Sequence, residues 1–113
     1  MKNAMQILQF KIQNVCLGCD VTELVQILPM MTLESVPNSP PYLQGMMNLS
    51  GTLIPVFDLT GYLQLEPFSY DLNTSILLLK AGDKSVGFIV EQVSHVFNIE
   101  KNKIQQKDFF KEK

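Results

Sequence analysis

The residues best suited to chemistry are Cys16 and Cys19, which form a Cys-Leu-Gly-Cys motif. The motif follows an expected strand and precedes an expected helix cap at Asp20. A cysteine pair in that setting is typical of thioredoxin-like redox centres, because a helix N-terminus lowers the pKa of a thiol. A thiol–disulfide oxidoreductase that uses Cys16 and Cys19 is therefore one hypothesis.

The same motif also fits a strand. If residues 15–19 form a strand, side chains three positions apart point to opposite faces. Cys19 would then be a small core residue and Cys16 would face outward, so a disulfide or a shared metal would be difficult to form.

Other catalytic and metal-binding groups are sparse. The single histidine, His95, lies in an apolar stretch, and we expect a packed or surface side chain. Two cysteines and one distant histidine fall short of a four-ligand zinc site. Asp58 follows an apolar run, where a helix N-cap is the expected role. The sequence has no phosphate-binding loop, nucleophile elbow or metalloprotease motif. We predict that the protein is not an enzyme and has no catalytic residues, no cofactor and no metal.

Composition restricts the possible partners and compartments. The 113 residues, 46% of them hydrophobic, are enough for one globular domain spanning 1–113. All nine basic residues are lysines, which argues against nucleic acid, because phosphate and guanine contacts usually recruit arginine. No apolar run approaches the ~20 residues of a membrane span. The N-terminus lacks the apolar core of a signal peptide, so we expect a cytoplasmic protein with no direct membrane insertion.

The elements that must position these residues are mostly short strands. We expect strands at 6–13 and 15–19, and hairpins whose turns lie at Ser50-Gly51 and at 82–84. A capping box from Asp20 to Glu23 predicts a short helix that ends at Pro29. Its inward positions would be Val21, Leu24, Val25 and either Ile27 or Leu28. Residues 30–36 could form another strand, and 64–74 a linker. This pattern favours small β-barrels or a sandwich.

The chain contains an internal repeat. Residues 7–27 align without gaps to 76–96 at an offset of 69, with identity at five of the 21 pairs. The match indicates a duplicated supersecondary unit. The cysteines map to Ser85 and Phe88, so they are not part of the duplicated pattern. Adding 69 to Gly45 passes Lys113, so we expect the second copy to lack its closing hairpin.

Four segments, in order, resemble motifs of the CheW family. Leu17-Gly18-Cys19-Asp20-Val21 resembles its [YF]-G-I-D-I element, and residues 36–45, Val-Pro-Asn-Ser-Pro-Pro-Tyr-Leu-Gln-Gly, resemble I-P-N-A-P-P-F-I-K-G. Residues 46–59 resemble V-I-N-L-R-G-x-I-V-P-V-I-D-L, and residues 86–93 resemble V-G-L-V-V-D-x-V. The resemblance spans almost the whole chain.

The resemblance implies a mainly β fold of two small five-stranded β-barrel subdomains, the second incomplete here, with one or two short helices. It implies a non-enzymatic adaptor of bacterial chemosensory arrays. Such an adaptor couples the cytoplasmic tip of a chemoreceptor to the regulatory domain of a CheA-type histidine kinase. A CheW-like domain within a larger signalling protein is a further possibility, and the start at Met1 favours a standalone adaptor.

The resemblance also implies where partners bind. It assigns groove positions between the barrels to Val21, Leu24, Ile27, Val86, Gly87 and Val93. Gln26 and Ser50 occupy positions where the family has Glu and Arg. The joint replacement of both suggests a charge pair removed as a unit, since one unpaired charge in a partly buried site is costly. For Gly87, a close backbone approach is the more natural role.

The family domain continues past residue 113 with a second hairpin and a helix, which is the segment that the repeat also lacks. We expect a domain truncated at the C-terminus. A barrel without that hairpin leaves apolar faces and strand edges in water. A homodimer or a strand swap that covers the gap is therefore also expected.

Overall fold

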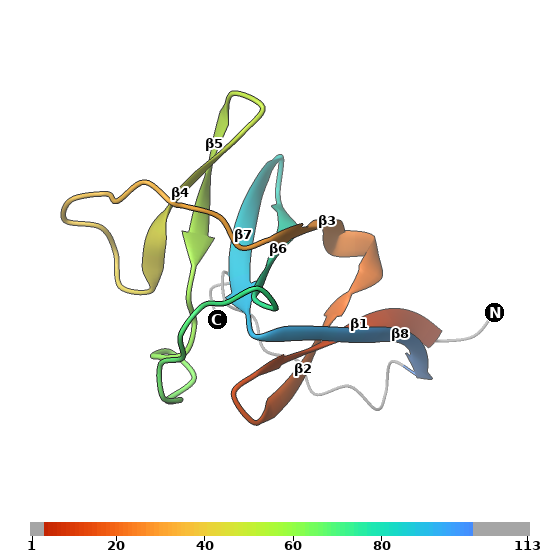
Figure 1. The fold of residues 1–113 in the computed structure, drawn as a ribbon. Coiled ribbons are helices and arrows are strands. Elements are labelled where there is room, and N and C mark those ends of the chain that lie inside the picture. Colours follow the sequence, from red (N-terminus) through yellow and green to blue (C-terminus); the bar gives the residue numbers. More distant parts are fainter. Residues whose placement is uncertain (1–3, 101–113) are drawn as a thin grey trace.

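The computed structural model describes residues 4–100, and it is built almost entirely from β-strands (Figure 1). One three-residue 3-10 helix, η1 (Val21–Glu23), is the only helix in this part of the chain. The mainly β class predicted from the sequence is confirmed, in the form of two sheets. The strands are β1 (Ala4–Ile12), β2 (Val15–Asp20), β3 (Leu24–Pro29), β4 (Leu43–Leu49), β5 (Thr52–Phe57), β6 (Ser75–Ala81), β7 (Lys84–Val90) and β8 (Gln92–Glu100).

The larger sheet has five strands in the order β3-β6-β7-β5-β4. All of its pairings are antiparallel except that of β5 with β7, which joins Val56 to Gly87 and Phe57 to Phe88. This parallel pairing begins one residue after Pro55, which has no N–H to donate. Beyond β3 the chain reaches the far edge of the sheet, where Glu34 forms an isolated bridge with Met46. The two ends of the larger sheet are thus joined through that bridge.

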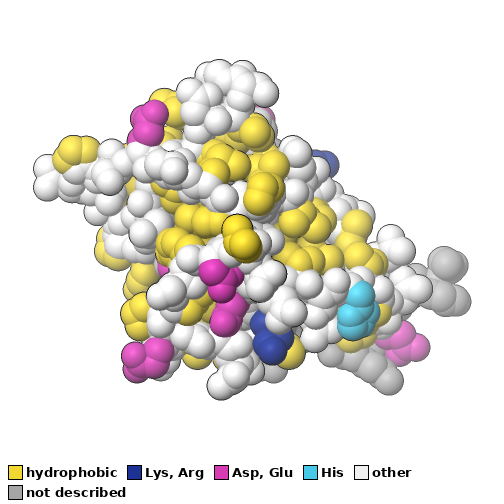
Figure 2. Space-filling model, in the orientation of Figure 1, with side chains coloured by type: hydrophobic (Ala, Val, Ile, Leu, Met, Phe, Trp, Pro, Cys, Tyr) yellow, Lys and Arg dark blue, Asp and Glu magenta, His cyan; other side chains and the backbone are white. Residues whose placement is uncertain are grey.

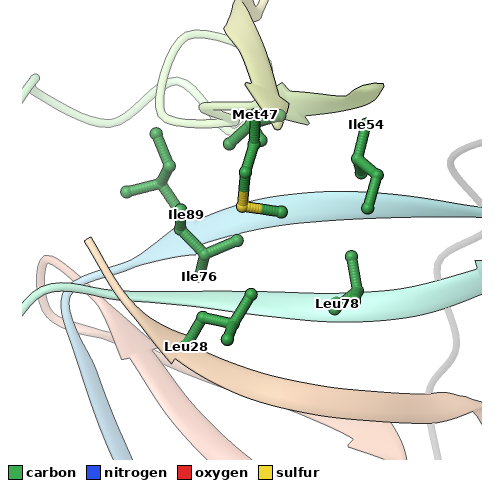
Figure 3. Close-up of a cluster of buried hydrophobic side chains, with 7 residues drawn as sticks. Leu28, Met47, Ile54, Ile76, Leu78 and Ile89 are labelled. Carbon is green, nitrogen blue, oxygen red and sulfur yellow. The ribbon is translucent and has the colours of Figure 1, made fainter. Parts of the chain in front are cut away.

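The core of the larger sheet lies between its hairpin β4–β5 and the strands β3, β6 and β7. Figure 3 shows Met47 and Ile54 pointing from the hairpin towards the side chains of the other three strands. Alternate residues of β4 and β5 are buried, as expected of strands with one face on a core. The fully buried members of this cluster, with at most 2% of their surface exposed, are Met47, Val56, Ile76, Leu78 and Ile89.

The smaller sheet has three strands in the order β2-β1-β8 and lies below the larger one in Figure 1. Both of its pairings are antiparallel. The chain passes from β7 into β8 through Glu91, whose backbone N–H donates to the Lys11 carbonyl at 2.9 Å. The Glu91 carboxylate accepts a 2.7 Å bond from the backbone N–H of Gln13. These two hydrogen bonds hold Glu91, where the chain passes from the larger sheet to the smaller one, against the end of β1 and the β1–β2 turn.

The 69-residue offset of the sequence repeat also relates the strand pairings. Hairpin β1–β2 pairs Leu8 with Cys19, and hairpin β6–β7 pairs Leu77 with Phe88. The third strand of each copy then pairs with the first strand of the other copy. In β3–β6 the register joins Leu24 to Leu79 and Ile27 to Leu77, and in β8–β1 it joins the 69-related pairs, Val93 to Phe10 and Val96 to Leu8.

The helix expected from Asp20 to Pro29 is wrong beyond its first turn. The Asp20 carboxylate does cap η1, accepting from the Thr22 backbone N–H at 2.9 Å. The chain then turns extended, and Leu24–Pro29 is strand β3. Val25, expected to point inward, is 48% exposed. Of the alternatives Ile27 and Leu28, Leu28 is the buried one at 8%, and Ile27 is 42% exposed. Pairing with β6 gives this segment a ladder of backbone hydrogen bonds that outweighs its helical spacing.

Two further local expectations are also wrong. Residues 30–36 form no strand and contribute only the bridge at Glu34. Asp58 caps a turn and not a helix: its carboxylate accepts from both the backbone N–H and the hydroxyl of Thr60, at 3.0 and 2.9 Å. The turn closes with a 2.9 Å bond from the Leu63 N–H to the Leu59 carbonyl, and no helix follows.

Asp58 also anchors the long connection between the hairpins. Its second carboxylate oxygen accepts a short hydrogen bond from the hydroxyl of Tyr70. The Tyr70 ring packs edge-on against Phe68, with centroids 5.5 Å apart. Burial, and then the hydrogen bond and charge of Asp58, raise the pKa of Tyr70 well above its ordinary value of 10.0.

Tyr70→Phe is expected to lower the free energy of unfolding by about 1 kcal/mol at neutral pH, because one side-chain hydrogen bond is lost. The wild-type bond contributes fully below about pH 10, the unfolded-state pKa, and is lost as pH rises through the higher folded-state pKa. The stability gap between wild type and Tyr70→Phe should therefore shrink in alkali. Urea unfolding from pH 7 to 11 measures it, with exposed Tyr42→Phe as the control. A gap that stays constant above pH 10 would contradict the assignment.

Candidate functional site

A half-buried apolar surface lies where the two sheets meet. Its floor is formed by four buried side chains, two from each sheet: Leu8 and Ile12 of β1, and Leu77 of β6 with Val90 of β7. Partly buried apolar side chains pack against this floor from β1, β2, η1, β3, β8 and the connection after β5. They are Phe10, Leu17, Cys19, Val21, Leu24, Leu63, Leu65, Phe68 and Val93. We call this set the inter-sheet cluster.

Three of the residues that the sequence assigned to partner binding lie together in this cluster. Val21 is in η1, Leu24 follows it at the start of β3, and Val93 is in β8. The Asp20 cap turns the chain between β2 and β3, which brings Val21 and Leu24 against the buried floor. Each side chain remains half-buried, so the cluster presents apolar surface at its rim.

Gln26 and Ile27 lie beside the cluster on β3, and both are exposed. With Val25 they form an exposed stretch of this edge strand, which we call the β3 face. Val25 and Ile27 are 48% and 42% exposed. Figure 2 shows hydrophobic side chains gathered across one face of the molecule with few charged groups among them. Several large apolar side chains that are exposed next to one another often form a protein-binding surface.

Val86 and Gly87 lie deeper, within β7. Val86 is half-buried and pairs with Leu79, the strand neighbour of Leu24. Gly87 is buried, and a Cβ atom there would stand 2.9 Å from Cγ2 of Ile76 and 3.2 Å from Cγ2 of Val56. Gly87 is therefore required for the close approach of β6 and β5, as expected of a glycine between packed strands.

Gln26 and Ser50 are both exposed. Ser50 lies in the β4–β5 turn with φ of 53°, and Gly51 follows with φ of 88°. Such a turn favours residues that tolerate positive φ. Exposure at both positions means that an unpaired charge there would cost little. The desolvation argument for their joint replacement therefore does not hold in this structure.

A second exposed apolar feature, an aromatic pair outside the cluster, was not predicted from the sequence. Tyr42 and Tyr62 are 45% and 47% exposed, and their rings meet edge-on with centroids 5.7 Å apart. A Cβ atom at Gly61 would stand 3.3 Å from the Tyr42 ring, so the glycine leaves room for it. Tyr42 precedes β4 and Tyr62 follows the Asp58 turn, and nothing local in either segment indicates that they meet.

The two cysteines do not form an activated pair. Cys16 is exposed and pairs with Lys11, whereas Cys19 is half-buried and pairs with Leu8. They stand three residues apart in one strand, β2, so their side chains point to opposite faces. Burial, and then the neighbouring Asp20 carboxylate, raise the pKa of Cys19 to about 11. A redox thiol needs the opposite shift.

Within residues 4–100, no group of three or more histidine, cysteine or acidic side chains could hold a metal ion. No helix of the described chain has the length and apolar character to cross a membrane. The inter-sheet cluster consists of apolar side chains and Cys19, and so offers a surface for apolar contact.

Comparison with known proteins agrees with this fold. The chain is 30% identical over 99 residues to the chemotaxis protein CheW of Thermotoga maritima, covering 88% of this chain and 65% of the relative. It is 29% identical over 100 residues to CheW of Klebsiella aerogenes, covering 88% and 60%. The solved structure of the scaffolding protein TtCheW of Thermoanaerobacter tengcongensis superposes with a TM-score of 0.81 at 23% identity, covering 87% of this chain and 67% of that one.

The chain thus spans roughly two thirds or less of the length of these curated relatives. The CheW-like domain family itself matches residues 6–113. Because this match extends over nearly the whole sequence, the chain belongs to the CheW-like domain family.

Proposed function

We propose that this protein is a non-enzymatic adaptor that couples chemoreceptors to a CheA-type histidine kinase in the cytoplasm. The observation that carries the proposal is the inter-sheet cluster: a half-buried apolar surface, built from both sheets, in a chain of the CheW-like family. Membership of that family supports a role in chemotaxis scaffolding. The partners themselves are inferred from what such adaptors connect.

The partner surface of this proposal comprises the eight residues expected from the sequence, in two roles. Gln26 and Ile27 of the β3 face, and Ser50 at the hairpin turn, are exposed, and we expect them to contact a partner directly. The other five have a supporting role: Val21, Leu24 and Val93 pack against the apolar floor of the inter-sheet cluster. Val86 and Gly87 lie in β7 outside the cluster, where Gly87 allows the close approach of β5 and β6. The regulatory domain of the kinase would cover the β3 face, and the chemoreceptor tip is the second partner.

Ile27→Asp is expected to weaken binding to the kinase regulatory domain at least tenfold, about 1.4 kcal/mol, because a charge would be desolvated in an apolar contact. Calorimetric titration with the regulatory domain from the same organism measures it. Leu72→Asp is the matched control, since Leu72 is fully exposed and lies outside the cluster. Equal affinities for the two variants, with both folded by circular dichroism, would exclude the β3 face.

Self-association is a separate prediction. The homodimer or strand swap expected from the sequence would have to cover the edges of the smaller sheet. Light scattering over a wide concentration range should show a mass that rises above that of one chain. A constant single-chain mass at the highest concentration would reject the homodimer. A swap of β4–β5 is the less favourable route, because Met47 and Val56 are 0% exposed in place.

The thiols separate the adaptor from the oxidoreductase hypothesis. At pH 8 a thiol reagent should modify Cys16 quickly and Cys19 slowly, because Cys19 is half-buried with a raised pKa. Cys16→Ser should remove the fast phase and leave the slow one. Two fast thiols, or ready formation of a disulfide between them, would instead favour redox chemistry.

A further inference from the structure

The two copies of the repeat have the same backbone conformation at one turn position but carry different residues there. The β1–β2 turn has Gln13 with φ of 56°, and the position 69 residues later, in the β6–β7 turn, is Gly82 with φ of 68°. Positive φ costs a glycine nothing and strains a residue with a Cβ atom. The turn conformation therefore favours glycine at both positions, and Gln13 is the exception that needs an explanation.

The side chain of Gln13 reaches a distant part of the chain. Its Nε2 donates to the carbonyl oxygen of Glu66 at 2.8 Å and to that of Pro67 at 3.3 Å. Both acceptors lie in the connection between β5 and β6, residues 58–74. A side-chain amide has two N–H donors, so one glutamine can serve both carbonyls. We call these two hydrogen bonds the Gln13 latch.

The backbone of Gln13 adds a link to a third segment. Its N–H donates to the Glu91 carboxylate at 2.7 Å, and the Glu91 N–H donates to the Lys11 carbonyl at 2.9 Å. Glu91 lies between β7 of the larger sheet and β8 of the smaller sheet. One turn residue thus joins the β1–β2 hairpin to the connection and to the place where the chain changes sheets.

The connection that the Gln13 latch holds forms part of the inter-sheet cluster. Leu63, Leu65 and Phe68 pack against the buried floor of the cluster, and Phe68 also packs against the core of the larger sheet. The hydrogen bonds of the Asp58 turn reach as far as Leu65, whose N–H donates to the Thr60 carbonyl at 2.7 Å. The bonds from Gln13 begin at the next residue and end just before Phe68.

We propose that Gln13 is a positioning residue for the partner surface, because its latch keeps the connection packed on the floor of the inter-sheet cluster. The latch offsets the strain of a glutamine at positive φ, which explains why this copy does not use glycine. Without it, Leu65 and Phe68 would have to be ordered when a partner binds, and that ordering would reduce affinity. The consequence for binding rests on the adaptor function proposed above, whereas the latch itself does not.

Three substitutions at Gln13 separate the latch from the turn conformation. Gln13→Gly removes the side chain and relieves the strained φ, Gln13→Glu keeps the size but lacks the N–H donors, and Gln13→Lys restores a donor. The readout is native-state hydrogen exchange of the Leu63 and Leu65 amides, which are hydrogen-bonded within the connection. Exchange should be about tenfold faster in the Gly and Glu variants and within about threefold of wild type in the Lys variant.

Gly82→Gln is the matched control. It places the same side chain at the equivalent turn, where a Cβ atom would meet nothing within 4 Å. This variant should lower the urea midpoint, because φ of 68° strains a glutamine, and should leave exchange at Leu63 and Leu65 unchanged. Gln13→Gly should show the opposite pattern, because relief of the strain offsets the lost bonds in the urea midpoint while exchange in the connection becomes faster. A role in the turn alone would not produce this opposition.

Calorimetric titration with the kinase regulatory domain tests the consequence for binding. Gln13→Gly should bind about threefold more weakly than wild type, and Gln13→Lys should bind like wild type. Faster exchange in Gln13→Gly with unchanged affinity would overturn the role of Gln13 in positioning the partner surface.

Two exchange results would overturn the latch itself. Wild-type exchange rates at Leu63 and Leu65 in Gln13→Gly would mean that the side chain does not hold the connection. Equally fast exchange in all three variants, Gln13→Lys included, would mean that the turn conformation and not the donor is responsible. If the wild-type chain does not bind the regulatory domain, the adaptor function fails, and the exchange rates still decide whether the latch exists.

Discussion

The structure depends on a reciprocal exchange of strands between the two copies of the repeat. Each copy forms its own hairpin, but its third strand pairs with the first strand of the other copy: β3 with β6, and β8 with β1. Without the exchange the smaller sheet would be reduced to the hairpin β1–β2, and an isolated hairpin is marginally stable in water. The larger sheet would lose its edge strand β3. The exchange therefore makes one cooperative unit of two sheets, although their strands come from different parts of the sequence.

The same exchange produces the candidate binding surface. The exchanged strands β3 and β8 carry Leu24 and Val93 into the inter-sheet cluster, and these two residues occupy equivalent positions of the repeat. Because β3 lies at the edge of the larger sheet, Val25 and Ile27 remain 48% and 42% exposed. The apolar surface is thus a consequence of the strand exchange between the two copies, and a partner that covers this surface would also cover parts of β3 and β8.

The copies differ where the larger sheet has gained a hairpin. Pairing with β5 buries Gly87 and its neighbours, whereas Gly18 and residues 19–21 stay exposed or half-buried. Burial, and then the neighbouring Asp20 carboxylate, raise the pKa of the Cys19 thiol to about 11, so the Cys-Leu-Gly-Cys motif gives no activated nucleophile.

Local sequence determined the mainly β class, the turns at Ser50-Gly51 and Gly82, and the family motifs. These depend on residues close in sequence: positive φ at Gly51 and Gly82, and alternation within each strand. The sequence also predicted that Val21, Leu24 and Val93 belong together, through the resemblance rather than through spacing. Tertiary structure alone decided that Leu24–Pro29 is a strand, because its partner β6 begins 46 positions after the strand ends. It alone decided the exposure of Ile27, because burial depends on which distant strand lies alongside, and helical or extended spacing carries no information about that neighbour.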